Sequence, residues 1–329
     1  MAEPSLEPWP SETDTWNNRP PLTTRAFLQT EKKNLIIAGL LLVATFITAT
    51  LAGYGWDLQY RMAAGWDLDV IAELLTKPWI VLRGLPYAAA LLFILLCHEM
   101  GHFMACWRYG IRSTPPFPIP FPSFPFLGQN FGTMGAFIKI RTPFMNRRQL
   151  FDVGVMGPLC GMAAAIPIFL AGLMLSVPSA YAYEGEVLVF GDSLLTAWLF
   201  RMFFPTGIEA IALHPLGWAA FFGFLATSIN LLPIGQLDGG HIVYAVLGPR
   251  GHRIISIACF AGLLGSSILS WPVPGYLLFA VILFLMKLRH PPTVNDGESI
   301  DRNRKLVALI ALAIFVLTFI PIPITIEYY

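Results

Sequence analysis

The sequence predicts an all-α, polytopic membrane protein of about seven transmembrane helices, with a small re-entrant β-hairpin or loop beside a polar site. The chain of 329 residues is 56% hydrophobic and 12% charged, whereas a soluble domain carries about 25% charged residues. Apolar stretches near the length that crosses a bilayer, about 20 residues, recur along it. We expect spans at 34–55, 79–106, 150–177, 216–236, 254–271, 274–288 and 305–323.

The segments between and before these spans divide the chain further. We expect 1–33 to be a flexible cytoplasmic tail, 34–78 to hold the first span and an extracytoplasmic loop, 79–250 to form the core with the polar site, and 251–329 to form C-terminal spans. The tail is acidic and has no basic start, which argues against a transit peptide or a cleaved signal. This favours the plasma membrane of a bacterium.

The distribution of basic residues gives an orientation. Lysine and arginine remain in cytoplasmic loops, and here they gather before the first span and after the second, fourth and sixth, while the alternate loops are acidic or nearly uncharged. The N-terminus is therefore expected inside, and the second span runs inward. A net charge of +1 argues against nucleic acid as a partner, so the expected surroundings are the lipid bilayer.

The inner end of the second span carries the sequence His98-Glu99-Met100-Gly101-His102. Residues four apart share a helix face, so His98 and His102 can bind one metal ion, with Glu99 beside it as a carboxylate base. The alternative is a chance pattern that caps a helix end. Since a charge at membrane depth costs at least about 2.5 kcal/mol, we favour the metal site.

The fourth span offers a third ligand, which a catalytic zinc site requires. It ends in the sequence NLLPIGQLDGGH, which places Asp238 at the depth of the histidines. Pro233 and Gly235 would break the helix and let Asp238 turn inward, and the Asn230 amide could donate a hydrogen bond to a developing oxyanion. The alternative reading of Asp238 is an ordinary turn at a helix end.

HEMGH followed by NLLPIGQLDGGH resembles the site-2 protease family of intramembrane zinc metalloproteases, in the branch without a PDZ domain that includes the plant chloroplast EGY-type proteases and bacterial relatives. The resemblance implies one Zn²⁺ per chain, bound by His98, His102 and Asp238. It assigns Glu99 as general base and Asn230 as an aid at the transition state. It further implies cleavage of single-span membrane proteins near the cytoplasmic face.

Between the second and third spans, a proline-rich run at 115–125 cannot be helical, and 131–140 is typical of a short strand. A cytoplasmic linker is the alternative, but the aromatic content favours a hairpin in the membrane, which the family resemblance also implies. An exposed strand edge would bind a substrate as a further strand. Gly132, Gly135 and Phe137 are therefore candidate substrate-binding residues.

Small residues at the start of the third span would let it approach the second span closely. The family resemblance implies that this helix also faces the site, so Gly157 and Pro158 of this stretch are candidates for shaping the substrate pocket. Of the remaining histidines, His241 is either a competing ligand, a neighbour of the site or a surface histidine. We expect His214 on the outer side, and His252 and His290 exposed in basic loops.

Two other functions would fit the same ligands. A transporter or metal channel usually contains internal repeats, and the sequence has no second copy of the motif. A proteolytically inactive protein that binds membrane helices would be expected to lack Glu99 or a ligand. The substrate, the cleaved bond, any regulator and the oligomeric state are left open by the sequence.

Overall fold

The computed structural model describes residues 31–67, 69–122, 130–179, 186–204, 210–269, 276–285 and 288–328. Nearly all of the tail expected at 1–33 lies outside these ranges. Within them the chain is mostly helical, as predicted.

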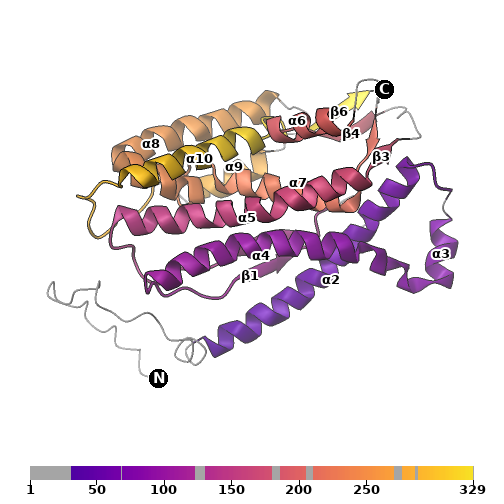
Figure 1. Cartoon of the computed structure of the whole chain (residues 1–329), viewed down its shortest axis with the longest axis horizontal. Coiled ribbons are helices and arrows are strands. Elements are labelled where there is room, and N and C mark those ends of the chain that lie inside the picture. Colours follow the sequence, from indigo (N-terminus) through magenta and orange to yellow (C-terminus); the bar gives the residue numbers. More distant parts are fainter. Residues whose placement is uncertain are drawn as a thin grey trace.

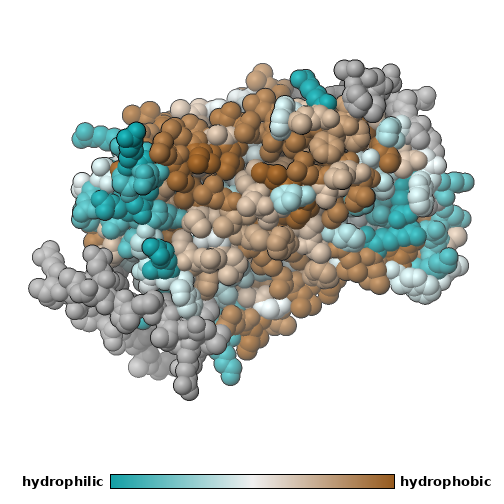
Figure 2. Space-filling view, in the orientation of Figure 1, coloured by the Kyte–Doolittle hydropathy of each residue, from teal (hydrophilic) through white to brown (hydrophobic). Residues whose placement is uncertain are grey.

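Four helices are long and apolar enough to cross a membrane. They are α2 (Lys32–Ala63), α4 (Leu85–Arg108) together with the preceding 3-10 helix η2 (Pro78–Gly84), α5 (Arg147–Leu175) and α8 (Asp238–Leu269). In Figure 1, α4, α5 and α8 run side by side along the longest axis, and α2 crosses the view obliquely. Figure 2 shows hydrophobic residues across the middle of this face and hydrophilic ones gathered at both ends, the pattern expected of a protein surrounded by lipid.

Three other predicted spans are shorter in the part of the chain that the structure describes. The helix α7 (Pro215–Asn230) has 16 residues, α10 (Arg302–Thr318) has 17, and α9 (Leu277–Leu285) has nine. Four elements therefore have the length and composition predicted for helices that cross a membrane. The predicted number of seven is not confirmed.

The predicted boundaries need two corrections. The span expected at 254–271 is the second part of α8, which begins at Asp238 and bends at Gly248, where φ is 73°. The span expected at 305–323 ends at Thr318, and the chain then forms strand β6 (Ile324–Tyr328). Propensity favoured a longer helix there, but Pro321 and Pro323 cannot donate the helical hydrogen bonds.

Side chains at helix starts satisfy free backbone N–H groups. The Asn146 side chain accepts a hydrogen bond from the Gln149 N–H at the start of α5, and Asp301 accepts one from the Arg304 N–H at the start of α10. These caps fix where the two helices begin, next to the loops that surround the site.

Aromatic side chains fill the core between the helices. The rings of Trp56 on α2 and Trp218 on α7 stack with centroids 4.5 Å apart, and Tyr87 on α4 and Phe222 on α7 join the same cluster. Glycine brings the backbones together, since a Cβ atom on Gly84 would lie 1.9 Å from a carbonyl oxygen of α2. The packing holds α4 firmly between α2 and α7.

The predicted hairpin is present. Strand β1 (Phe117–Pro120) pairs antiparallel with β2 (Thr133–Phe137). The Thr48 hydroxyl of α2 donates to the Gly132 carbonyl at 2.6 Å, and the Trp56 indole N–H donates to the Asn130 carbonyl at 3.2 Å. The hairpin therefore lies against the side of α2, a membrane-length helix, rather than in a separate cytoplasmic linker.

A second set of elements gathers at one end of the molecule in Figure 1, where α3 (Val70–Thr76) and β3 (Val177–Pro178) lie. There β3 pairs with β5 (Ile211–Ala212), and β4 (Glu186–Phe190) pairs with β6. The amphipathic helix α6 (Leu194–Phe203) lies nearby and exposes Leu194, Trp198 and Met202. The start of α2 lies at the opposite end of the molecule in Figure 1, and Figure 2 shows hydrophilic residues at both ends.

Candidate metal centre

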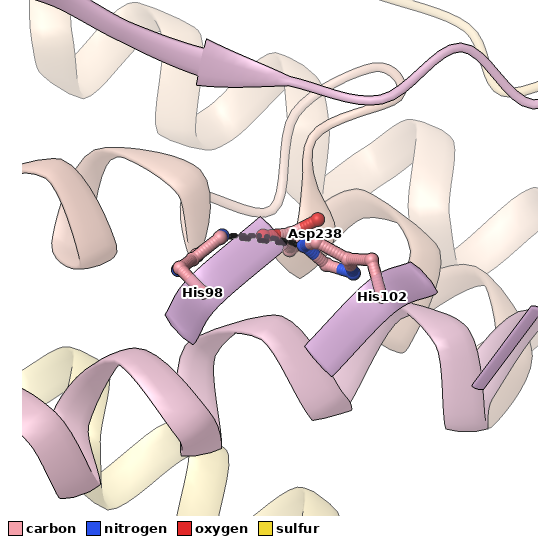
Figure 3. Close-up of side chains that lie close together, drawn as sticks. All are labelled: His98, His102 and Asp238. Carbon is pink, nitrogen blue, oxygen red and sulfur yellow. Dashed lines mark hydrogen bonds and ion pairs between the residues drawn. The ribbon is translucent and has the colours of Figure 1, made fainter. Parts of the chain in front are cut away.

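Two buried histidines from α4 and a carboxylate from α8 meet at one point (Figure 3). His98 and His102 are one helical turn apart and are 4% and 6% exposed. After α7 ends at Asn230, the chain turns through Pro233 and Gly235, which adopts φ 56°. Asp238 then begins α8 and lies against both imidazoles, so the break expected in this segment is confirmed.

The three ligand atoms form a nearly equilateral triangle. The Nε2 atoms of His98 and His102 are 3.2 Å apart, and Oδ2 of Asp238 lies 3.1 Å from the first and 3.3 Å from the second. Tetrahedral zinc with bonds of about 2.0–2.1 Å places its ligands about 3.3 Å apart. The spacing therefore fits one zinc ion held by these three side chains.

The backbone of α5 orients the second histidine. The Nδ1 atom of His102 is 2.7 Å from the Val153 carbonyl oxygen, which accepts its hydrogen. This contact assigns the proton to Nδ1 and leaves Nε2 free to bind metal, the arrangement usual for metal-binding histidines.

Glycines of α5 form a wall directly against the ligands. A Cβ atom on Gly157 would lie 2.0 Å from Nε2 of His102, and one on Gly161 would lie 3.1 Å from Nδ1 of His98. Pro158 is buried within α5 between them. The close approach predicted for this stretch is confirmed.

Glu99 and Asn230 flank the triangle. Glu99 is 6% exposed, and its carboxylate interacts with the Ile138 backbone N–H just beyond β2. The Asn230 side-chain nitrogen is 3.3 Å from Nε2 of His98. A carboxylate and an amide donor therefore lie beside the three ligands, as the proposed roles of both residues require.

Two cavities meet at the centre and share His98, Glu99, Ala136 and Asn230. One, of about 410 Å³, is mainly apolar and extends between α4, α7 and the hairpin. The other, of about 680 Å³, is more polar and follows residues 136–144 toward the loops. Of the candidate substrate-binding residues, Gly135 lines the first and Phe137 the second, whereas Gly132 packs against α2 and lines neither.

One wall of the polar cavity is formed by a segment that the sequence did not indicate. Residues 290–296, which we call the strap, return to the site after α9, and His290, Pro291, Pro292 and Thr293 line the cavity. The Val294 and Asn295 N–H groups donate to the carbonyls of Phe144 and Met145, at 3.0 and 2.8 Å.

Charged and polar side chains also hold the strap. Asp296 accepts a hydrogen bond from Tyr244 at 2.6 Å and lies 3.7 Å from Arg147. The strap is thus tied to both α5 and α8. In the sequence the strap shows prolines, one histidine and a short polar run, and none of these indicates a tertiary contact.

The remaining histidines differ from expectation. His241 lies outside the ligand triangle, with its Nδ1 atom 2.7 Å from Nε2 of His290. Burial lowers the pKa of His290 to about 4, and His252 is buried with Nε2 3.1 Å from the Gly235 carbonyl. The prediction that His252 and His290 are exposed is wrong: His252 is buried and His290 is half-buried, because His290 returns with the strap and packs against the rings of Tyr244 and His252. His214 caps α7 away from this site.

The sequence is similar to those of known proteins. Residues 86–265 match the sequence profile of Peptidase family M50. The chain is 31% identical over 251 residues to a probable zinc metalloprotease EGY1, chloroplastic, of Oryza sativa subsp. japonica. The aligned region is 73% of this chain and 41% of that protein. The corresponding EGY1 of Arabidopsis thaliana is 30% identical over 247 residues (73% and 43%), and its EGY2 is 29% identical over 243 residues (73% and 42%). The chain spans about two fifths of the length of these relatives.

Proposed function

The chain belongs to Peptidase family M50, and on that premise we propose that it is an intramembrane zinc endopeptidase that cleaves single-span membrane proteins near the cytoplasmic face. The observation that carries this proposal is the triangle of His98, His102 and Asp238, with the buried Glu99 beside it. Relatives named as zinc metalloproteases support the choice of metal. One zinc ion per chain is expected.

The residues around the triangle have distinct chemical roles. When bound, zinc supplies Lewis-acid chemistry that activates water at neutral pH. Glu99 accepts the proton of the attacking water and returns it to the leaving nitrogen of the peptide bond. Asn230, next to His98, donates a hydrogen bond to the oxyanion that develops on the scissile carbonyl.

The substrate reaches these groups as an extended chain. Helical amides are already hydrogen-bonded, so a transmembrane helix must unwind before a peptide bond can be attacked. The second edge of β2 has no strand partner among the described residues, and it faces Glu99 through the Ile138 N–H. A substrate that adds to this edge as a strand exchanges its helical hydrogen bonds for new ones.

The site requires a membrane topology in which polar groups can reach it. We propose seven spans with the N-terminus in the cytoplasm, in which α7, α9 and α10 complete the four longer helices. The polar ends in Figure 2 and the placement of α3, β3 and β4 opposite the start of α2 in Figure 1 support this arrangement. The relatives reported above are chloroplast proteins, and the expected bacterial plasma membrane remains a prediction.

A proteolysis assay tests the function directly. The intact chain and its Glu99→Gln variant are each co-expressed with a library of tagged single-span membrane proteins. We expect shortened fragments only with the intact chain, and uncut proteins with the variant. Equal processing by both would contradict the protease function and favour a transporter or a helix-binding protein.

A further inference from the structure

The two cavities at the metal centre differ in character along the path that an extended substrate would take. The apolar cavity is lined by side chains such as Leu91, Ile94 and Phe222, and the polar cavity by Lys139 and Gln236 among others. A chain that passes Glu99 along β2 therefore leaves an apolar environment and enters a polar one. Its apolar span belongs in the first cavity and its flanking polar segment in the second.

The backbone beyond β2 shows which groups remain for that polar segment. The Lys139 N–H donates to the Thr114 hydroxyl at 2.9 Å, and its carbonyl accepts from the Thr114 N–H at 3.0 Å. Since backbone groups alternate sides along a strand, those of Ile138 and Ile140 point to the opposite edge, toward the cavity. The Ile138 N–H already interacts with Glu99, so a substrate strand would pair with the Ile138 carbonyl and with Ile140, and place one of its own side chains opposite Lys139.

Among the residues that the structure describes, Lys139 is the cation of this cavity that has no ion-pair partner. Its side chain is exposed, and no acidic group of the described residues lies within ion-pair distance of it. Arg141, the other cation of the lining, is neutralised by Glu31 at 3.0 Å. The acidic lining residues are Glu99 and Asp238, both at the metal centre.

The strap that faces Lys139 adds no charge to the lining. It contributes two prolines, Thr293 and His290, and burial keeps His290 neutral at pH 7 by lowering its pKa to about 4. A substrate side chain opposite Lys139 would therefore meet a single positive charge.

We propose that Lys139 selects substrates by charge, so that the polar cavity accepts acidic side chains close to the scissile bond and rejects basic ones. This inference rests on the proposed function and defines the substrate class of the same site. Opposite charges across a strand pair stabilise it and like charges destabilise it, each by about two- to fivefold in binding. Most single-span proteins carry lysine or arginine on their cytoplasmic side. A cation at residue 139 repels such basic flanking segments, so the site selects its substrates by repulsion.

Three synthetic single-span peptides test the proposal. They share one apolar span and carry two glutamates, two glutamines or two lysines at its cytoplasmic end. Cleavage by the full chain in detergent, measured as kcat/KM, should favour the glutamate peptide over the lysine peptide by about four- to twentyfold. Lys139→Glu should reverse this preference, and Lys139→Gln should reduce it.

The matched control is Arg112→Glu. Arg112 is exposed at the same end of the molecule but lines neither cavity, so this variant should keep the preference of the unchanged chain. The same order of preference in Lys139→Glu and the unchanged chain would overturn the proposal.

A binding measurement separates this inference from the proposed function. Affinities of the three peptides for the zinc-loaded Glu99→Gln variant, with and without Lys139→Glu, do not require turnover. A charge preference in binding that reverses with residue 139 would support selection even where no peptide is cut. Cleavage of all three peptides at equal rates would leave the protease function intact and refute selection by Lys139.

Discussion

The ring of His102 leaves no room for a side chain at residue 157, because its Nε2 atom lies 2.0 Å from where a Cβ atom on Gly157 would be placed. The ligand and the glycine belong to α4 and α5, two helices that pack along their length. The metal centre therefore depends on a close helix contact as well as on its three ligands.

We expect Gly157→Ala to weaken zinc binding by about 10–100-fold, the range known for changes that misplace a metal ligand. The added methyl group must push His102 or the whole of α5 away from the triangle. Zinc affinity of the purified variant, measured by competition with a chelator, checks this. Gly262→Ala is the matched control, since a Cβ atom there meets nothing within 4 Å, and it should bind zinc normally. Unchanged affinity in Gly157→Ala would contradict the packing argument.

Asp238 and His241 should differ in their effect on metal content. Asp238 contacts both histidines, whereas His241 is directed to His290 of the strap. We expect Asp238→Ala to lose zinc and His241→Ala to retain one equivalent. Elemental analysis of the two purified variants measures this, with His98→Ala as the reference for zinc loss. Zinc loss from His241→Ala alone would mean that the third ligand is assigned to the wrong residue.

The histidine of the strap should make this segment sensitive to acid. The folded-state pKa of His290 is about 4 and its usual value is 6.5, so the released strap binds a proton more readily than the closed one. The contribution of His290 to the stability of the docked strap is therefore complete above about pH 6.5 and is lost as the pH falls toward 4. Burial raises the pKa of Asp296, but hydrogen bonds from Thr293 and Tyr244 outweigh this and hold it below its usual value, so Asp296 remains charged for most of this range.

Hydrogen exchange of the Val294 and Asn295 amides, corrected for the intrinsic effect of pH, measures this opening. Both amides are bonded to the segment before α5, and their protection should fall between pH 6.5 and 4.5. In His290→Gln, whose side chain cannot titrate, protection should depend less on pH over this range. An equal loss of protection in the variant would assign the effect to another group.

The proposed topology predicts the side of the membrane on which each loop lies. A reporter fused after Arg148 should be cytoplasmic, as should one fused after Arg304, and one fused after Asp192 should be extracytoplasmic. The reason is that basic loops remain inside and Asp192 lies next to α6 at the other polar end. A cytoplasmic signal at Asp192 would mean that the orientation is the opposite of the proposed one, with the metal centre near the outer face.

Local patterns explain which parts of the site could be predicted. The pairing of His98 with His102 depends on helical spacing alone, and the inward turn of Asp238 depends on the proline and glycine just before it. The contact of His241 with His290 joins residues 49 apart, and it forms because the strap returns across the cavity. No periodicity or turn signal in the sequence contains that information.

The same limit explains the error at the end of α10. Hydropathy predicts a helix to 323, but the chain ends that helix at Thr318 and pairs β6 with β4. Strand pairing between residues more than a hundred positions apart depends on how the whole bundle brings the ends together. Pro321 and Pro323 indicate that the helix ends early, but the partner of the strand that follows cannot be deduced from local sequence.

The last prediction separates chemistry from metal binding. Glu99→Gln keeps the size of the side chain but removes its basicity, so the variant should retain zinc and lose cleavage by about 10²–10⁴-fold, the usual contribution of general acid–base catalysis. Asn230→Ala removes one oxyanion donor and should lower kcat by about 10²–10³-fold, again with zinc retained, because the asparagine is adjacent to His98 without belonging to the triangle. Zinc content and cleavage are measured on the same preparations, so that a lost metal cannot be mistaken for a lost base. If Glu99→Gln cleaves as fast as the unchanged chain, the proton must move through another group and the proposed mechanism is wrong.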